Sequence, residues 1–268
     1  MLLAEVEYAR PASVEDAVRL LAANDGARPL AGGQTLTNVM KARAAAPDVL
    51  VDLNDLDELR TISRSGEGGL ELGAMVTLSE LIRSSEVDGA RPILAEVAGQ
   101  IADVQVRNRG TIGGNICSND PTNHLPPLVA ALDAAMTIRV GDGERTVPSE
   151  EFFLGVYMTA VGPGELLTRI TVPAAGGARD GFASIPIGRD GTCICNAAAS
   201  VADGQARIAL GCVAAVPVVL TSPADESAVR DAVRGADLDP PSDVHASADY
   251  RRHLAEIVAV RAVQKATS

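Results

Sequence analysis

Apolar residues recur at helical spacing close to the N-terminus, over residues 11–23. Ser13 suits the N-cap of this helix, with Asp16 three residues later. The residues on its apolar face are Val14, Ala17, Val18 and Leu21. Downstream, an extended segment at 27–36 runs into two glycines, and an apolar strand at 49–56 ends in turn-forming residues. The pattern therefore predicts a helix followed by two extended segments.

Residues 57–173 mix short apolar runs with turn-forming residues. Two strands are predicted within 59–76, joined by a Gly-rich turn. Thr77 and Glu80 have the spacing of a capping box and predict a helix over 77–84. Other apolar runs predict helices at 91–102 and 125–134, and strands at 136–140, 144–148 and 166–173.

A stretch rich in Pro, Gly and Ala at 173–181 predicts a linker. The segments predicted beyond it are strands at 181–187, 193–201 and 206–213, and helices at 224–235 and 248–266. Strands and helices do not alternate strictly along the chain. We therefore expect an α+β fold rather than a doubly wound parallel sheet.

Composition excludes several classes of function. The 268 residues are 47% apolar, which allows a sizeable core, and the formal net charge is −12. Such a charge provides no positive field for a nucleic-acid backbone. No apolar run is long enough for a membrane span, and the N-terminus lacks the pattern of a signal peptide. We therefore expect a cytoplasmic protein with neither a nucleic-acid partner nor a membrane span.

The four cysteines are Cys117, Cys193, Cys195 and Cys212. None of them forms the C-x-x-C spacing that is usual at metal sites, so we expect no metal site. The pattern favours buried or half-buried free thiols. Redox or metal chemistry is the alternative.

Two Gly-Gly pairs, at 31–35 and 111–115, stand beside hydroxyl and amide side chains. Glycine lets a backbone approach a phosphate closely, and Gln, Thr and Asn add hydrogen bonds. Neither pair is a Walker A loop or a Rossmann fingerprint. Taken alone, each pair fits a tight turn as well as a pyrophosphate site.

Longer segments around these pairs resemble a known family. Residues 28–60 and 104–121 are similar to the two FAD-binding segments of the medium (flavoprotein) subunit of molybdenum hydroxylases. That group includes aerobic carbon monoxide dehydrogenase and the xanthine dehydrogenases. Segments 164–173, 206–217 and 247–263 resemble later parts of the same subunit, in the same order. The resemblance therefore covers essentially the whole chain.

The resemblance implies a vanillyl-alcohol-oxidase/p-cresol-methylhydroxylase-type FAD-binding fold of two subdomains. A C-terminal α/β domain of the carbon monoxide dehydrogenase flavoprotein type would follow. The implied boundaries are 1–56, 57–173 and 174–268. In this family the two glycine segments converge on the pyrophosphate of FAD. The residues implied to contact FAD are Ala31, Gly32, Gly33, Gln34, Thr35, Leu36, Ile101, Thr111, Gly113, Gly114, Asn115, His124 and Leu167.

The resemblance also implies a division of labour among subunits. A molybdopterin-binding large subunit oxidises the substrate, a [2Fe-2S] small subunit relays electrons, and FAD in the medium subunit passes them to an external acceptor. No side chain of this chain is then expected to act as a catalytic acid or base. The expected assembly is a dimer of heterotrimers. The alternatives are a stand-alone flavin oxidase of the same fold and a flavin-free assembly scaffold.

The chain departs from the family pattern at several positions. His124 replaces a common aspartate, and either contacts a hydroxyl of FAD or stabilises its own loop. Ser184 replaces a basic residue, and Ile194 lies where some members place a tyrosine against the flavin ring. Arg107 and Arg109 either bind an anion or pair with carboxylates of this acidic chain.

Overall fold

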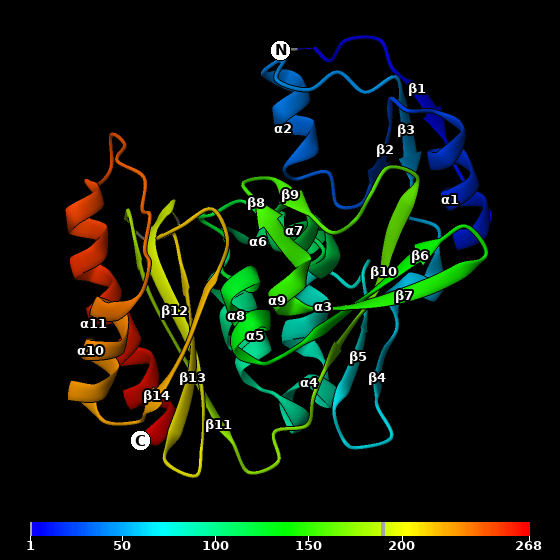
Figure 1. The fold of residues 1–268 in the computed structure, drawn as a ribbon. Helices are drawn as coiled ribbons and strands as arrows, with labels where there is room; N and C mark the ends of the chain where they lie inside the picture. Colours follow the sequence, from blue (N-terminus) through cyan, green and yellow to red (C-terminus); the bar gives the residue numbers. More distant parts are fainter. Residues whose placement is uncertain (1, 189–190) are drawn as a thin grey trace.

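The computed structural model describes residues 2–188 and 191–268, with three main sheets and helices around them (Figure 1). The N-terminal sheet is parallel, in the order β1-β3-β2. Its elements are β1 (Glu7–Ala9), α1 (Val14–Ala23), β2 (Ala27–Leu30), α2 (Leu36–Lys41) and β3 (Val49–Asp52). The predicted first helix is confirmed, because α1 buries its four predicted apolar residues and the Ser13 hydroxyl accepts from Asp16 N.

The second sheet is antiparallel, in the order β4-β5-β10-β6-β7. Its strands are β4 (Ile62–Arg64), β5 (Leu70–Gly73), β6 (Ala135–Val140), β7 (Gly143–Pro148) and β10 (Glu165–Val172). A two-stranded hairpin consists of β8 (Phe153–Gly155) and β9 (Met158–Thr159). The predicted strands of this region are thus confirmed, with small shifts at their ends.

Helices gather on one side of the second sheet and bury its main apolar cluster (Figure 1). The capping box predicted at Thr77 and Glu80 is present. The helices in the part of the chain between β3 and β8 are η1 (Asp57–Arg60), α3 (Leu78–Arg83), α4 (Ser85–Ala90), α5 (Ile93–Gly99), α6 (Val104–Arg109), α7 (Ile112–Ser118), α8 (Leu125–Ala131) and α9 (Ser149–Phe152).

The third sheet is antiparallel, in the order β11-β12-β13-β14. Its elements are β11 (Arg179–Pro186), β12 (Cys193–Ala202), β13 (Gln205–Gly211), β14 (Val218–Pro223), α10 (Glu226–Gly235) and α11 (Ala248–Thr267). One face contacts α8, and the other packs against α10 and α11 (Figure 1). The third sheet therefore lies directly against α8, the helix that follows and contacts α7.

Several sequence-based expectations differ from the structure. The extended segment expected at 27–36 is a strand only to Leu30, because the glycine turn that follows leads into α2. The linker expected at 173–181 is shorter, since β11 already pairs from Arg179. Residues 104–118 contain two short helices, so the second glycine pair lies inside α7 and not in a loop.

Within residues 2–188 and 191–268, no helix combines the length and apolar character needed to cross a membrane. The same residues contain no cluster of three or more His, Cys, Asp or Glu side chains placed to hold a metal ion.

Candidate functional site

The first glycine pair forms the turn between β2 and α2. Gly33 has a φ of 73°, a left-handed conformation that glycine adopts without steric cost. Thr35 occupies the N-cap of α2, but no side chain caps this end. The backbone N–H groups from Gly32 through Leu36 donate to no acceptor in the described part of the chain. The turn therefore presents a run of unpaired donors.

The carbonyl groups of the same turn, in contrast, are occupied. The four carbonyl groups from Ala31 through Gln34 each accept a hydrogen bond from a side-chain amide or a backbone N–H. The pairs are Ala31 O with Asn54 Nδ2 at 3.1 Å, Gly32 O with Gln34 Nε2 at 3.0 Å, Gly33 O with Thr37 N at 3.1 Å, and Gln34 O with Asn38 Nδ2 at 2.8 Å. Because the acceptors are paired and the donors are not, the turn has the character of an anion-binding nest.

The second glycine pair lies in the first turn of α7. Thr111 is the N-cap, and its hydroxyl oxygen accepts from Gly114 N at 3.0 Å. The amides of Ile112 and Gly113 donate to carbonyls of the preceding β5–α3 segment at 2.9 Å each. Since these amides are already paired, this segment offers side chains rather than free N–H groups. Asn115 Oδ1 is buried and has no hydrogen-bond partner in the described part of the chain.

The two glycine segments contact one another. A Cβ on Gly32 would overlap the carbonyl oxygen of Arg109 and lie 3.0 Å from Gly110 Cα. A Cβ on Gly114 would lie 3.7 Å from Ala31 Cβ. The close approach of the segments therefore depends on the missing side chain of Gly32 in particular. The first turn and the start of α7 therefore meet at one junction.

Comparison with known proteins identifies the family of this chain. Residues 4–175 match the family described as the FAD binding domain in molybdopterin dehydrogenase. The chain belongs to this family. Its members bind FAD, so the predicted cofactor is confirmed.

Relatives extend the match over the full chain. The carbon monoxide dehydrogenase medium chain of Afipia carboxidovorans is 38% identical, over 99% of this chain and 98% of the relative. The glyceraldehyde dehydrogenase medium chain of Sulfolobus acidocaldarius is 31% identical, over 97% and 98%. The carbon monoxide dehydrogenase structure from Oligotropha carboxidovorans has a TM-score of 0.94 at 36% identity, over 99% of both chains. The chain is thus an FAD-binding medium subunit, an oxidoreductase component, and its expected α+β fold is confirmed.

The residues at the junction of this medium subunit fit FAD. A pyrophosphate is an anion, and the N–H groups from Gly32 through Leu36 are free to donate to it. The unpartnered Asn115 Oδ1 can accept a hydrogen bond from a hydroxyl or amino group. The buried Asn115 Oδ1 costs free energy unless a partner satisfies it, which argues that a ligand group belongs beside it.

Ile101 and Leu167 are further predicted FAD contacts of the medium subunit, and both pack against the main apolar cluster. Ile101 is half-buried beside α5, and its carbonyl accepts from Arg107 Nη1 at 3.0 Å. Leu167 is buried in the same apolar cluster as Ile112 of α7. Their contacts to FAD stay predictions. Within the described residues Arg107 pairs with no carboxylate; it donates to the carbonyls of Ile101 and Ala102 and so holds the turn before α6, and its anion-binding role stays a prediction.

His124 joins the FAD-binding region to the C-terminal sheet. It is buried at the N-cap of α8, and its ring centroid lies 5.1 Å from that of Phe182 in β11. Its Nδ1 lies 3.3 Å from Asn196 Nδ2 in β12. The ring therefore contacts two strands of the third sheet, while its expected role within its own loop stays a prediction. Whether the ring also contacts a hydroxyl of FAD stays a prediction.

The other positions that depart from the family pattern belong to the C-terminal sheet. Ser184 Oγ lies 3.4 Å from Gln100 Oε1, next to the predicted contact Ile101. Ile194 is half-buried against the C-terminal core, and its carbonyl accepts from the buried Arg251. This hydrogen bond to Ile194 fastens the final helix to the start of β12. Arg251 also forms an ion pair with Asp243, at 2.6 Å.

Sequence reasoning missed two residues that support the site. Asn54 follows β3 and supports the first turn through Ala31 O. Asn196, in β12, connects His124 with Asn123, whose carbonyl accepts from Asn196 Nδ2 at 3.3 Å. The polar residues at the end of β3 were a usable signal for Asn54. No local pattern singles out Asn196 within an apolar strand.

Proposed function

We propose that this medium subunit carries FAD as the electron-transfer subunit of a heterotrimeric molybdenum hydroxylase. Electrons would come from a molybdopterin-binding large subunit through a [2Fe-2S] small subunit and leave to an external acceptor. Two heterotrimers would associate as a dimer in the cytoplasm. The observation that carries the proposal is the turn at Gly32–Leu36, where every donor is unpaired and the carbonyls are occupied.

The protein's part in this function is to bind and orient the cofactor. The first turn holds the pyrophosphate through backbone N–H groups, and the Gly32 contact with Arg109 keeps the second segment against it. Asn115 and the Thr111 hydroxyl provide polar side chains beside this anion site. FAD itself supplies the electron-transfer chemistry when bound, while the protein sets its position and surroundings. No acid–base residue is needed in this chain.

The proposal is tested by expressing the chain with a molybdopterin-binding and a [2Fe-2S] subunit of the same enzyme class. We expect all three to purify together, with flavin absorption in the visible spectrum. Reduced small subunit should bleach this absorption in the complex. Purification of the chain without flavin or partners after co-expression would contradict the proposal. Flavin without partners would support the stand-alone oxidase instead.

We predict that Asn115→Leu weakens FAD binding without destabilising the unliganded chain. Leaving one polar group of FAD without its partner costs about 1–3 kcal/mol of binding free energy. The unliganded protein loses no hydrogen bond at this oxygen, because Asn115 Oδ1 has no partner within the described residues. FAD titration by fluorescence and urea unfolding without FAD measure the two effects. Reduced stability with unchanged FAD affinity would show that Asn115 only supports the fold.

A further inference from the structure

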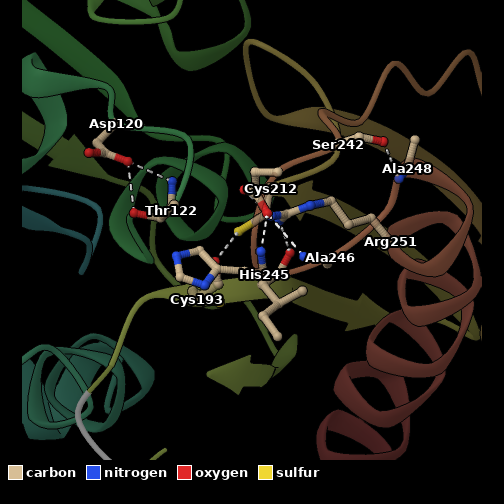
Figure 2. A network of polar contacts seen from close by, with 11 residues as sticks. Asp120, Thr122, Cys193, Cys212, Ser242, His245, Ala246, Ala248 and Arg251 are labelled. Carbon is tan, nitrogen blue, oxygen red and sulfur yellow. Dashed lines mark hydrogen bonds and ion pairs between the residues drawn. The ribbon is translucent and has the colours of Figure 1, made fainter. Parts of the chain in front are cut away.

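Two cysteines meet between β12 and the end of β13, and the FAD site uses neither. Cys193 begins β12, and Cys212 directly follows β13; both are buried free thiols. Asn196 Nδ2 lies 3.5 Å from Cys193 Sγ and 3.7 Å from Cys212 Sγ. Figure 2 shows the Cys212 side chain directed at Cys193, with Cys212 Sγ 3.6 Å from the Cys193 carbonyl oxygen. The two sulfur atoms thus share the neighbourhood of one amide group.

The surroundings of the pair favour one thiolate and one thiol. A hydrogen bond from the Cys212 thiol lowers the pKa of the Cys193 thiol, against the opposing effect of burial, and the nearby His124 ring lowers it further. The same hydrogen bond, together with burial, raises the pKa of Cys212. A thiolate beside a protonated thiol is the starting arrangement for disulfide formation.

The other two cysteines lack this arrangement. Burial raises the pKa of both Cys117 and Cys195 to about 12, so neither provides a thiolate at neutral pH. The Cys195 sulfur lies 4.0 Å from the carbonyl oxygen of Arg251, on the side of the final helix. The chain therefore contains two internal controls for thiol reactivity.

Cys193 is buried, and the two residues that directly precede it, Gly191 and Thr192, are exposed.

We propose that Cys193 and Cys212 form a modification site at which hydrogen peroxide oxidises the two thiols to a disulfide. Cys193 thiolate attacks one peroxide oxygen, the O–O bond breaks, and the leaving hydroxide takes a proton to become water. The sulfenic acid on Cys193 is then attacked by Cys212 sulfur. The S–O bond breaks, and the leaving hydroxide takes the Cys212 proton to form a second water. The thiols lose two electrons, and the peroxide gains them.

The site borders the FAD-binding region. Asn196, which contacts both sulfurs, also contacts Asn123 and His124. Asn123 Nδ2 in turn donates to the carbonyl oxygen of Asn115 at 3.1 Å. The inference concerns the thiols alone, however, and holds whether or not the proposed electron-transfer function is correct.

The test treats the folded full-length chain with hydrogen peroxide, blocks remaining thiols with an alkylating reagent under denaturing conditions, and maps the peptides by mass spectrometry. We expect a Cys193–Cys212 disulfide, with Cys117 and Cys195 still alkylated. Cys193 should react faster than Cys117 on the order of tenfold or more, because only the thiolate is nucleophilic. The wild-type chain alone decides this result, so it does not depend on whether a variant folds.

Variants then assign the roles of the two thiols. In Cys212→Ser, Cys193 should stop at the sulfenic acid and be trapped by a cyclic diketone. In Cys193→Ser, Cys212 should stay reduced. Cys195→Ser is the matched control and should form the same disulfide as the wild type. Equal oxidation of all four cysteines, or a linked peptide that contains Cys195 or Cys117, would overturn the proposal, as would a folded chain with no disulfide.

Discussion

Gly32→Ala should abolish FAD binding, with a loss of affinity on the order of 100-fold or more. The added Cβ would overlap the carbonyl oxygen of Arg109, a backbone atom that cannot rotate away as a side chain can. The first turn must then separate from the second segment, which breaks up the junction between them. Binding geometry of this kind tolerates little displacement.

FAD-dependent stabilisation measures this effect separately from folding. A ligand at 100 times its Kd stabilises the folded state by about 2.7 kcal/mol, so the wild-type unfolding midpoint should rise with FAD. The unfolding midpoint of the Gly32→Ala variant should not change with FAD concentration. Gly66→Ala is the matched control, because a Cβ there meets no atom within 4 Å. Equal FAD-dependent shifts in both variants would show that the glycine contact is not needed.

The N-terminal helix shows what local pattern predicts well. Its apolar spacing, its Ser13 cap and the later capping box of Thr77 and Glu80 all depend on residues within one or two turns of each other. The structure reproduces each of them. The first glycine turn was likewise predictable as a candidate anion site, since its unpaired donors follow from its glycines and from the helix that begins there.

The helices around the second glycine pair show where local pattern is insufficient. Residues in α7 include two adjacent glycines, which are poor helix formers, and no apolar period marks the segment. The helix forms because distant groups hold its first turn. Ile112 N donates to Val76 O, and Gly113 N donates to Ala74 O. A contact such as that of His124 with Asn196 joins residues 72 positions apart, which no local pattern contains.

Arg91→Met should destabilise the folded chain by about 3–5 kcal/mol, because it leaves the buried Asp180 carboxylate without a partner. The Arg91 guanidinium donates to both carboxylate oxygens of Asp180 at 2.8 and 2.7 Å, and to Pro173 O at 3.1 Å. Only 5% and 7% of the two side chains are exposed. Urea unfolding measures the loss. Arg252→Met is the control, since its exposed pair with Asp249 contributes about 1 kcal/mol or less.

The double variant Arg91→Met with Asp180→Leu separates two contributions to the free energy of unfolding. One is the net contribution of the ion pair, and the other is the destabilisation caused by a buried unpaired charge. Apolar replacements of a buried pair recover much or all of the lost stability. We therefore expect the double variant to be more stable than Arg91→Met alone. Arg91 follows α4, and Asp180 lies in β11, just past the segment that joins the two regions. A double variant as unstable as Arg91→Met would instead indicate that the directional bonds to Asp180 and Pro173 are needed to dock the C-terminal sheet.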